Sequence, residues 1–555
     1  VHETIGAYGI MTGDPVLDRS VGWSAAMLAA NRHYIDGIIV PMPCPAEYNF
    51  YFTHDVLLTD LGAVHYDRER VKRDLAYITS LARDTVIPHA YYWRDDGMKT
   101  EFCPPDNWNH LWFILASASY IRHAQDDSAA AQLFPFVKKS LTMILTQRRN
   151  DGLLYAKHPD WWDIGSVDGP RAYITALTVR AIGEYCALAS RLGESDAGAL
   201  RRLEQTADAM KTMLVEKLWD SQLNYLINYN GQDKDRHIYA GSLVAGAYGV
   251  LDNDRNLRMA ETARRAIVDS RLGVRTVSPT DFNTDSVIAY FHLAGNEAGA
   301  PFVYANGGIW PHTTSWYIWV LNAAGKKDEA AAFLKTTLSI DGIMASPMGQ
   351  PAMYEYRFAD PASPRYGEID KPTFMWAAGF FLQSLYRIYG ISDNEWNISI
   401  GLRPESGAGA TSRFPFVFGK TQGNAASNMV IVMSGSGACI QSVRIGGRLI
   451  PSAVIPLDAS GDSISVGYGS CTSPYLESVN AIVHSAEEIQ GGIAVTLSSF
   501  EGHTTKARFL CVRPPKRILI DGRAVRSSNR KDRRGVVVDV AFRARTGRQT
   551  VQLKF

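Results

Sequence analysis

The chain has 555 residues, of which 46% are apolar and 20% charged, a composition typical of a soluble globular protein with room for two or three domains. Its formal net charge of +1 excludes a global field for nucleic acid or for an anionic membrane surface. No apolar run reaches the roughly 18 residues that a membrane helix requires, so we expect neither nucleic acid nor a membrane as a partner.

Six cysteines are spread along the chain, and none has the spacing of a zinc site, so we expect no metal and no cofactor. Their pairing is not readable from the sequence, although Cys186 lies in a helical pattern typical of a buried thiol. No signal peptide is evident, and the first residue is Val, as in a processed or trimmed chain. The compartment stays open between a bacterial-type periplasmic or secreted location and the cytoplasm, and a homo-oligomer is left open.

Helical patterns follow one another from a lead-in segment over 1–19 up to residue 390. In 171–190, for example, Ile174, Leu177 and Ala181 fall on one helix face. The patterns cover 23–32, 55–66, 68–83, 108–123, 129–147, 171–190, 197–218, 238–251, 256–269, 281–293, 313–324, 328–338 and 374–389.

Long loops rich in Pro, Gly, Trp and His separate alternate helices, and loops of such length are usually functional. About twelve helices with a long loop at every second connection predict six helical hairpins in a ring. That is an (α/α)6 barrel over 20–392, with the long loops gathered on one face. A helical solenoid is the alternative, and the lack of a fixed repeat period disfavours it.

Past Gly390 the pattern changes to short β-rich runs divided by Gly, Ser and Asn turns. Asp521-Gly522 is a hairpin signal among them. These runs predict a smaller C-terminal antiparallel β-sandwich over 393–555, so the fold class is mainly α. Such a sandwich either binds carbohydrate or packs on the barrel, and packing is the commoner role.

Two loops could supply the carboxyl groups of a sugar-cleaving enzyme. Residues 158–165 hold two aspartates and two tryptophans, and Trp rings stack on sugars while a carboxyl group moves a proton. The second loop places Glu355 between Tyr354 and Tyr356, with Arg357 two positions on, and these neighbours would keep a general base ionised. The structural alternatives are a core-filling loop with a capping Asp and a salt bridge between Glu355 and Arg357.

Two further stretches are compatible with a sugar site. In 304–312 a Gly pair permits close backbone approach, and Trp310 and His312 can serve as platform and donor. In 48–55, Asp55 either caps a helix or accepts hydrogen bonds from sugar hydroxyls. Other sugar-compatible side chains are Trp93, Asp106, Asn107 and His110.

These motifs, in this order, resemble those of the six-hairpin glycosidases, a group that includes the glucoamylases, the processing α-glucosidases and the cellobiose phosphorylases. The segments are 51–55 with His54 in place of the family's Arg, 160–163, 308–311, and 354–356 followed by Trp376. The resemblance covers roughly 20–390. It implies that Asp55 holds the non-reducing sugar.

The resemblance also implies the roles of the other motifs. Asp163, at the end of an Asp-Trp-Trp-Asp run, matches the general acid, and Glu355 matches the general base of the hydrolases. Trp162, Trp310 and His312 would shape the pocket. Inversion needs two carboxyl groups about 6.5–9.5 Å apart on opposite faces of the sugar. We therefore expect an inverting glycosidase acting on an oligosaccharide with a glucose-like non-reducing end, with Asp163 kept protonated by its Trp neighbours.

Three other functions stay open at this point. A phosphorylase holds phosphate with an early Arg, a His after the Gly-Gly-Ile stretch and a Thr-Gly pair; here only His312 matches, so hydrolysis is favoured. A polysaccharide lyase can share the fold but needs Arg or Lys beside a uronate, and these loops are acidic and aromatic. The third is a glycan-binding protein without turnover.

Overall fold

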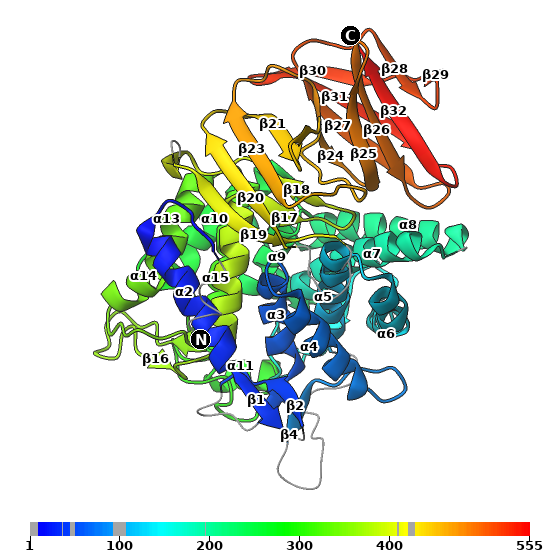
Figure 1. The fold of residues 1–555 in the computed structure, drawn as a ribbon. Helices are drawn as coiled ribbons and strands as arrows, with labels where there is room; N and C mark the ends of the chain where they lie inside the picture. Colours follow the sequence, from blue (N-terminus) through cyan, green and yellow to red (C-terminus); the bar gives the residue numbers. More distant parts are fainter. Residues whose placement is uncertain are drawn as a thin grey trace.

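The computed structural model describes residues 9–35, 37–44, 50–92, 107–194, 196–407, 410–419 and 428–555. Helices dominate the chain up to residue 388, and strands dominate it from residue 391 onward. Figure 1 shows the helical region in the lower part of the view, with the C-terminal strands above it. The structure thus confirms a mainly helical region followed by a smaller β-rich one.

Six described helices form a closed circuit, in which each contacts the next and the last contacts the first. Their side chains are buried on nearly every face, and apolar residues are spread around each helix together with some buried polar ones. In chain order they are α3 (Thr53–Ala63), α5 (Asn109–Ala124), α7 (Ala172–Leu192), α9 (Val244–Ala247), α12 (Pro311–Ala323) and α15 (Met375–Ile388). We call them the inner helices.

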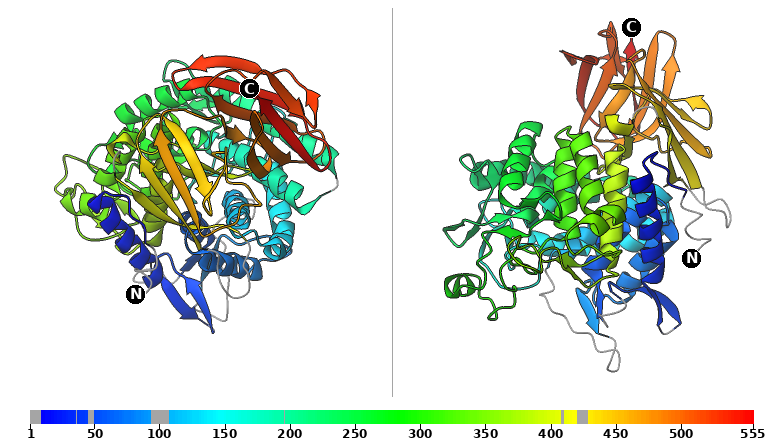
Figure 2. Two further views of the ribbon diagram at one scale, coloured as in Figure 1. Left: turned by 45° about the horizontal axis from the view of Figure 1, so that its top comes forward. Right: turned by 90° about the vertical axis from the view of Figure 1, so that its left-hand side faces the viewer.

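A second set of helices packs outside the inner ones and buries only one face of each helix. Five of them begin with an Asp whose carboxylate accepts a backbone N–H, the usual N-cap. This outer set comprises α2 (Pro15–Ala30), α4 (Arg68–Ser80), α6 (Asp127–Leu145), α8 (Ala197–Met213), α10 (Asn253–Ala266) and α13 (Lys327–Thr337). In the tilted view on the left of Figure 2, helices lie around the centre of the molecule and the C-terminal strands lie in front of them.

Glycines let the first and last inner helices touch backbone to backbone. A Cβ on Gly379 of α15 would lie 2.6 Å from Thr59 Cα, and a Cβ on Gly62 of α3 would meet the Gly379 carbonyl. Real Cβ atoms do not approach so closely, so only glycine fits this contact. We call it the glycine seam.

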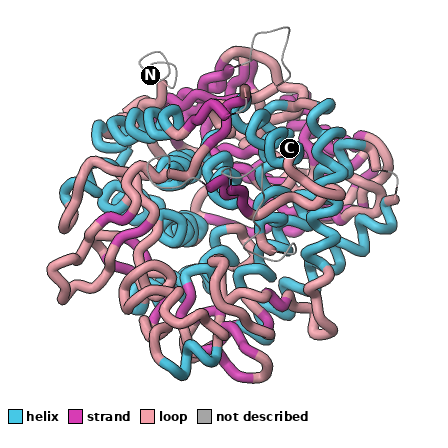
Figure 3. The backbone as a smooth tube through the Cα atoms, turned by 90° about the horizontal axis from the view of Figure 1, so that it is seen from below, coloured by secondary structure: helices cyan, strands magenta, loops and turns pink. Residues whose placement is uncertain are grey.

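Short helices and two-stranded sheets fill the loops between the helices, at the end seen in Figure 3. The helical pieces are η1 (Leu214–Leu218), η2 (Ala240–Leu243), α11 (Asp285–Tyr290) and α14 (Ile340–Ala345). The strand pairs are β1 (Arg32–Ile35) with β2 (Ile38–Pro41), β3 (Phe50–Phe52) with β4 (Ala90–Tyr92), β5 (Tyr155–Ala156) with β6 (Gly169–Pro170), β7 (Trp219–Asp220) with β8 (Tyr225–Leu226), β9 (Asn228–Asn230) with β10 (Asp233–Asp235), β11 (Ile238–Tyr239) with β14 (Val277–Ser278), β12 (Val268–Asp269) with β13 (Gly273–Val274), and β15 (Tyr356–Arg357) with β16 (Ile369–Asp370).

The C-terminal region follows the linking pair β17 (Ile391–Asp393) and β18 (Ile398–Ile400) and the turn η3 (Glu405–Gly407). It holds three larger sheets. The first contains β19 (Ser412–Val417), β20 (Asn428–Gly435), β23 (Ser463–Gly469), β21 (Cys439–Ile445) and β22 (Arg448–Leu449). The second contains β24 (Tyr475–Val479), β27 (Thr504–Cys511), β31 (Gly535–Arg543) and β30 (Ser528–Asp532). The third contains β25 (Ile482–Ile489), β26 (Gly492–Ser498), β32 (Arg548–Lys554), β28 (Arg517–Ile520) and β29 (Arg523–Ala524).

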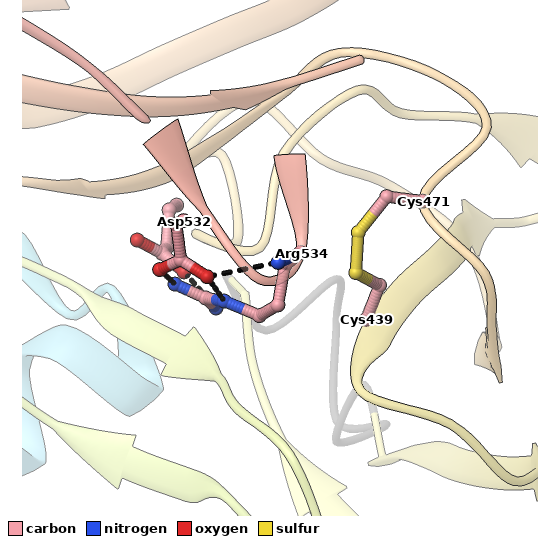
Figure 4. The surroundings of a disulfide bond; sticks show 5 residues. Cys439, Cys471, Asp532 and Arg534 are labelled. Atoms are coloured by element: carbon pink, nitrogen blue, oxygen red, sulfur yellow. Dashed lines mark hydrogen bonds and ion pairs between the residues drawn. A yellow bond between two sulfur atoms is a disulfide. The ribbon is translucent and has the colours of Figure 1, made fainter. Parts of the chain in front are cut away.

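One strand pair corrects the expectation of a purely antiparallel region, because β20 and β23 run parallel. A disulfide joins Cys439, at the start of β21, to Cys471, just after β23 (Figure 4). Arg534, drawn beside it, donates to Asp532 within the tight turn between β30 and β31. Cys186 is buried as a free thiol, as expected.

Two features of the helical region differ from the sequence expectations. α2 begins at Pro15, capped by Asp14, well before the pattern that starts at residue 23. The helix expected over 238–251 is reduced to η2 and α9, because this stretch holds three glycines and Gly246 packs against Asn256 and Val320. In the described part of the chain, no helix combines the length and apolar character needed to span a bilayer.

Candidate active site

A pocket with about 480 Å³ of empty space lies at the N-terminal ends of four inner helices and among the loops that precede them. Seven of its lining residues are aromatic, three are carboxylic acids and two are histidines, and none of these described lining residues is Arg or Lys. They are Phe52, His54, Asp55, His89, Trp108, Trp161, Trp162, Asp163, Tyr304, Trp310, Glu355 and Trp376.

The inner helices begin differently from the outer ones. The residues that precede α3, α5, α12 and α15 are aromatic, and none makes a side-chain cap; they are Phe52, Trp108, Trp310 and Phe374. The start of a helix carries a partial positive charge from the helix dipole. Asp55 lies in the first turn of α3 and is not its cap, which removes the structural alternative for this residue. The helix starts thus supply positive potential beside the pocket's carboxylates.

Asp163 is held by a histidine from another loop. His89 Nε2 lies 3.3 Å from Asp163 Oδ2, and Asn109 Nδ2 lies 2.6 Å from His89 Nδ1. Burial acts to raise the pKa of Asp163, but the hydrogen bond and the other electrostatic effects of the nearby His89 outweigh burial, so this pKa is lowered. The expectation that Trp neighbours keep Asp163 protonated is therefore corrected for the free protein.

The loop around Asp163 is anchored beneath the pocket by its other polar residues. The backbone N–H of Gly241 donates to Asp160 Oδ2 at 3.1 Å, and a Cβ at Gly241 would collide with that carboxyl group. Arg171, at the start of α7, donates to the Pro159 carbonyl oxygen. His158 Nδ1 lies 3.0 Å from the Gly165 carbonyl, which closes the loop on itself. These contacts hold the backbone on both sides of Asp163.

Glu355 reaches the pocket from the loop before α15 and is 3% exposed. Its carboxylate pairs with Lys371 Nζ at 2.9 Å. Arg357, the partner of the structural alternative, instead donates to the carbonyl oxygens of Gly367 and Pro347. Glu355 therefore has a counter-charge, but it comes from Lys371.

The three carboxyl groups of the pocket are close enough to affect one another. Burial, followed by the negative charge of Glu355 and then of Asp163, raises the pKa of Asp55 well above its usual value. Burial and the charges of all three acids likewise raise the pKa of Tyr304. Asp55 therefore keeps its proton to a higher pH than an ordinary aspartate, and while protonated it can donate a hydrogen bond as well as accept one.

Of the residues expected from the sequence, seven line the pocket: His54, Asp55, Trp162, Asp163, Trp310, Glu355 and Trp376. Tyr356 stacks on Trp310 beside it, with ring centroids 5.3 Å apart. Asn107 accepts the Asn109 N–H at the start of α5 and is not a lining residue. Trp93 and Asp106 lie outside the described residues.

Four expected substrate-binding side chains do not line this pocket and are fully buried. His110 Nδ1 lies 2.9 Å from the Ser140 hydroxyl, toward α6. His312 is enclosed by aromatic rings, among them Trp161 at 4.0 Å between centroids. Tyr354 and Arg357 pack together behind Glu355.

Five lining residues were missed: Phe52, His89, Trp108, Trp161 and Tyr304. Phe52 and Trp108 share a local signal, an aromatic residue directly before an all-apolar helix, which Trp310 and Phe374 repeat. His89 has no local signal, because it becomes meaningful only when its loop meets the loop of Asp163.

An aromatic pocket with convergent carboxyl groups from separate loops can stack a sugar ring and exchange protons with its anomeric substituents. This site and fold define a glycoside hydrolase of the six-hairpin group. The sequence model of the amylo-alpha-1,6-glucosidase family matches residues 68–349, and the chain belongs to this family. The resemblance to six-hairpin glycosidases is thereby confirmed.

Two solved structures support the fold. A GH78 family rhamnosidase of Bacillus sp. GL1 is 18% identical with a TM-score of 0.52, and the match covers 84% of this chain and 44% of that one. A rhamnosidase from Klebsiella oxytoca with rhamnose bound is 18% identical with a TM-score of 0.50, covering 69% of this chain and 65% of that one. This chain therefore spans less than two thirds of either protein. No curated protein matches it.

Proposed function

We propose that the protein is an inverting glycoside hydrolase that removes a glucose-like sugar from the non-reducing end of an oligosaccharide. Its catalytic domain would be an (α/α)6 barrel over about 20–392, with 393–555 as a C-terminal domain. The closed circuit of inner helices and the outer set packed on it support the barrel. The proposal for the reaction rests on one observation: Asp163 and Glu355, from loops far apart in the sequence, line one aromatic pocket.

In the proposed reaction Asp163 donates a proton to the leaving glycosidic oxygen. Glu355 deprotonates a water that attacks the anomeric carbon from the opposite face of the sugar. In the free protein the His89 contact favours ionised Asp163, whose side chain is 26% exposed. A bound sugar would cover this carboxyl group, and the loss of water favours the protonated form that an acid needs. Asp55 would hold the non-reducing sugar through its hydroxyl groups.

The charges of the pocket favour hydrolysis over the alternatives. Phosphate binding calls for Arg, Lys or a nest of backbone donors, and a lyase neutralises a uronate with Arg or Lys. The described lining residues include neither cation, and Lys371 pairs with Glu355. His312, the residue that could have held phosphate, is enclosed by aromatic rings.

The substrate is sought with a panel of defined linkages, assayed with and without phosphate. α-1,6-Linked glucose oligosaccharides come first, because the matched family is described as amylo-alpha-1,6-glucosidase. Other glucosides and rhamnosides follow, since rhamnose is bound in one structural neighbour. Proton NMR of the first product should show the inverted anomer. Retention of configuration would contradict the mechanism, and phosphate-dependent turnover would favour a phosphorylase.

Two substitutions test the acid and the base. Asp163→Asn and Glu355→Gln should each lower kcat by about 10²–10⁴-fold or more, because each removes a proton-transfer group. Glu368→Gln is the matched control, since Glu368 lies in the same loop and pairs with Arg365 at the surface. Circular dichroism and thermal unfolding check that the fold is kept. Near-normal rates in either site variant would refute that assignment.

A further inference from the structure

His89 is the one polar side chain that contacts the proposed acid from a different loop among the described residues. It lies between the C-terminal end of α4 and β4, whereas Asp163 lies between β5 and β6. Its side chain is 3% exposed, whereas that of Asp163 is 26% exposed. Nothing in the local sequence of either loop predicts that they meet.

The side-chain amide of Asn109 determines which ring nitrogen of His89 carries the proton. With Nδ2 as the donor at 2.6 Å, His89 Nδ1 must accept, so the proton of the neutral ring sits on Nε2. That Nε2–H points at Asp163 Oδ2, 3.3 Å away. Because Asn109 is the first residue of α5, the helix fixes the amide and the amide fixes the histidine.

We propose that His89 is a positioning residue for the general acid: it donates a hydrogen bond to Asp163 Oδ2, in a tautomer set by Asn109, and holds Asp163 toward the glycosidic oxygen. The proposal rests on the function proposed above, in which Asp163 is the acid. One carboxylate oxygen, Oδ2, is engaged by His89, so Oδ1 is the atom that transfers the proton. The hydrogen bond also sets the pH at which Asp163 loses its proton.

Other titratable groups surround this pair and must be counted in any pH effect. Burial, with the charge of His89, lowers the pKa of His54 to about 3, so His54 is neutral at working pH. Burial lowers the pKa of His158, and the nearby Asp163 partly opposes this. The acids that face the pair are Asp55 from α3, Tyr304 and Glu355, the last with Lys371 beyond it. None of these groups contributes a hydrogen bond to Asp163 among the described contacts, so removal of His89 takes away the hydrogen bond that Asp163 receives from another loop.

The first measurement follows the proton on Asp163 directly. Infrared titration of the carboxylate band, taken as the difference between wild type and Asp163→Asn, isolates this group without a substrate. In His89→Ala the titration should move up by about one pH unit or more, because the ionised form loses a donor. In His89→Gln, which keeps an N–H donor, it should move less. In Asn109→Asp it should move down, since a carboxylate at Nδ1 favours the doubly protonated, cationic histidine.

The second measurement is the alkaline limb of kcat/KM, which reports the acid of the free enzyme. It should shift in the same order and direction as the titration in the three variants. In addition, His89→Ala should lower kcat for the oligosaccharide about 10-fold, and much less for α-D-glucosyl fluoride. Fluoride departs without protonation, so misplacing the acid affects it little. A merely structural histidine would change both substrates alike.

The outcomes separate two failures. If Asp163→Asn abolishes turnover of the oligosaccharide, yet neither the titration nor the alkaline limb moves in His89→Ala and Asn109→Asp, the role of His89 is refuted while the proposed acid stands. If Asp163→Asn keeps normal turnover, the acid assignment fails, and the positioning role fails with it, whatever the titration shows. If the Asp163 titration and the alkaline limb of kcat/KM shift together in the variants, the results support both the acid assignment and the positioning role of His89.

Discussion

Asp160 shows how one carboxyl group of a motif can be structural while its neighbour faces the pocket. It is 3% exposed, and its carboxyl group accepts a hydrogen bond from the Gly241 backbone N–H. Burial raises its pKa to about 8, although Arg171 opposes this. Asp160 is therefore a neutral anchor at moderate pH, and its charge becomes costly in alkali.

The stability of the protein should reflect this. Between the unfolded pKa, about 3.9, and about 8, the folded state holds one more proton than the unfolded state, so stability falls as pH rises through this range. Asp160→Asn removes the titration but keeps an oxygen for Gly241. We expect the variant to match wild type near pH 4 and to be more stable at pH 9, as measured by urea unfolding. Identical pH profiles would contradict this.

The residues that were predictable from the sequence share a property: they belong to short local motifs. Asp163, Glu355 and Trp310 lie in loops whose Trp, Tyr and Gly content already indicates a sugar site. His89 was not predictable because its role depends on a contact between two loops. The place of Arg357 was not predictable either, because its guanidinium donates to the carbonyl oxygens of Gly367 and Pro347, which lie ten residues away on either side.

At the scale of elements, the glycine seam joins α3 to α15 next to the pocket. Gly379 lies one turn beyond Trp376, and α3 begins at the turn that holds Asp55. Any side chain inserted in the seam would separate the two helices and shift these pocket residues. The seam was not predictable from the sequence, because a glycine inside a helical pattern does not indicate which helix it packs against.

Gly379→Ala tests the seam. Its Cβ would lie 2.6 Å from Thr59 Cα, and overpacking of this kind costs about 1–3 kcal/mol, more than the helix propensity gained. We expect a lower Tm and a higher KM. Gly198→Ala in α8 is the control, because only flexible side-chain ends lie near its Cβ, and it should be neutral or slightly stabilising. An unchanged Tm in Gly379→Ala would contradict the close contact.

The positions of the helices were largely predictable from the sequence. The residue composition of a helix also indicates whether it belongs to the inner or to the outer set. The inner helices have apolar residues on all sides, whereas the outer ones bury one face, and five of the six outer helices have an Asp cap. The stretch 238–251 shows the limit, since its apolar pattern predicts a full helix but its glycines allow only η2 and α9.

At the scale of the whole molecule, a buried polar network links the helical region to the C-terminal strands. Asp393 in β17 contacts His123 Nε2 at 3.0 Å and Arg122 Nη2 at 3.4 Å, at the end of α5. His123 Nδ1 lies 2.9 Å from the Val417 carbonyl of β19. Burial acts to raise the pKa of Asp393, but His123 and Arg122 outweigh it and hold this pKa well below the usual range.

A carboxyl group with a depressed pKa stabilises the fold above its unfolded pKa, about 3.9, and this contribution is lost as pH falls toward the folded value. Asp393→Asn should cost about 3–5 kcal/mol at pH 7, because it removes a buried carboxylate that contacts both His123 and Arg122. Its stability should fall less steeply than that of wild type on acidification. Asp539→Asn, which breaks an exposed pair with Arg508, should cost under about 1 kcal/mol. If urea unfolding shows the same loss of stability in Asp393→Asn and Asp539→Asn, the buried network does not stabilise the protein more than an exposed ion pair does.

The glycine seam also has a consequence for how the protein is made. α3 is synthesised before the other inner helices, and its partner α15 is synthesised last among them. The face of α3 that packs on α15 therefore stays uncovered until almost the whole helical region has been made. Until then Asp55 and Trp376 cannot share a pocket, and apolar helix faces stay open to water. A nascent chain that stops short of α15 is thus both inactive and prone to aggregate, and closure of the ring makes activity and protection from aggregation appear together.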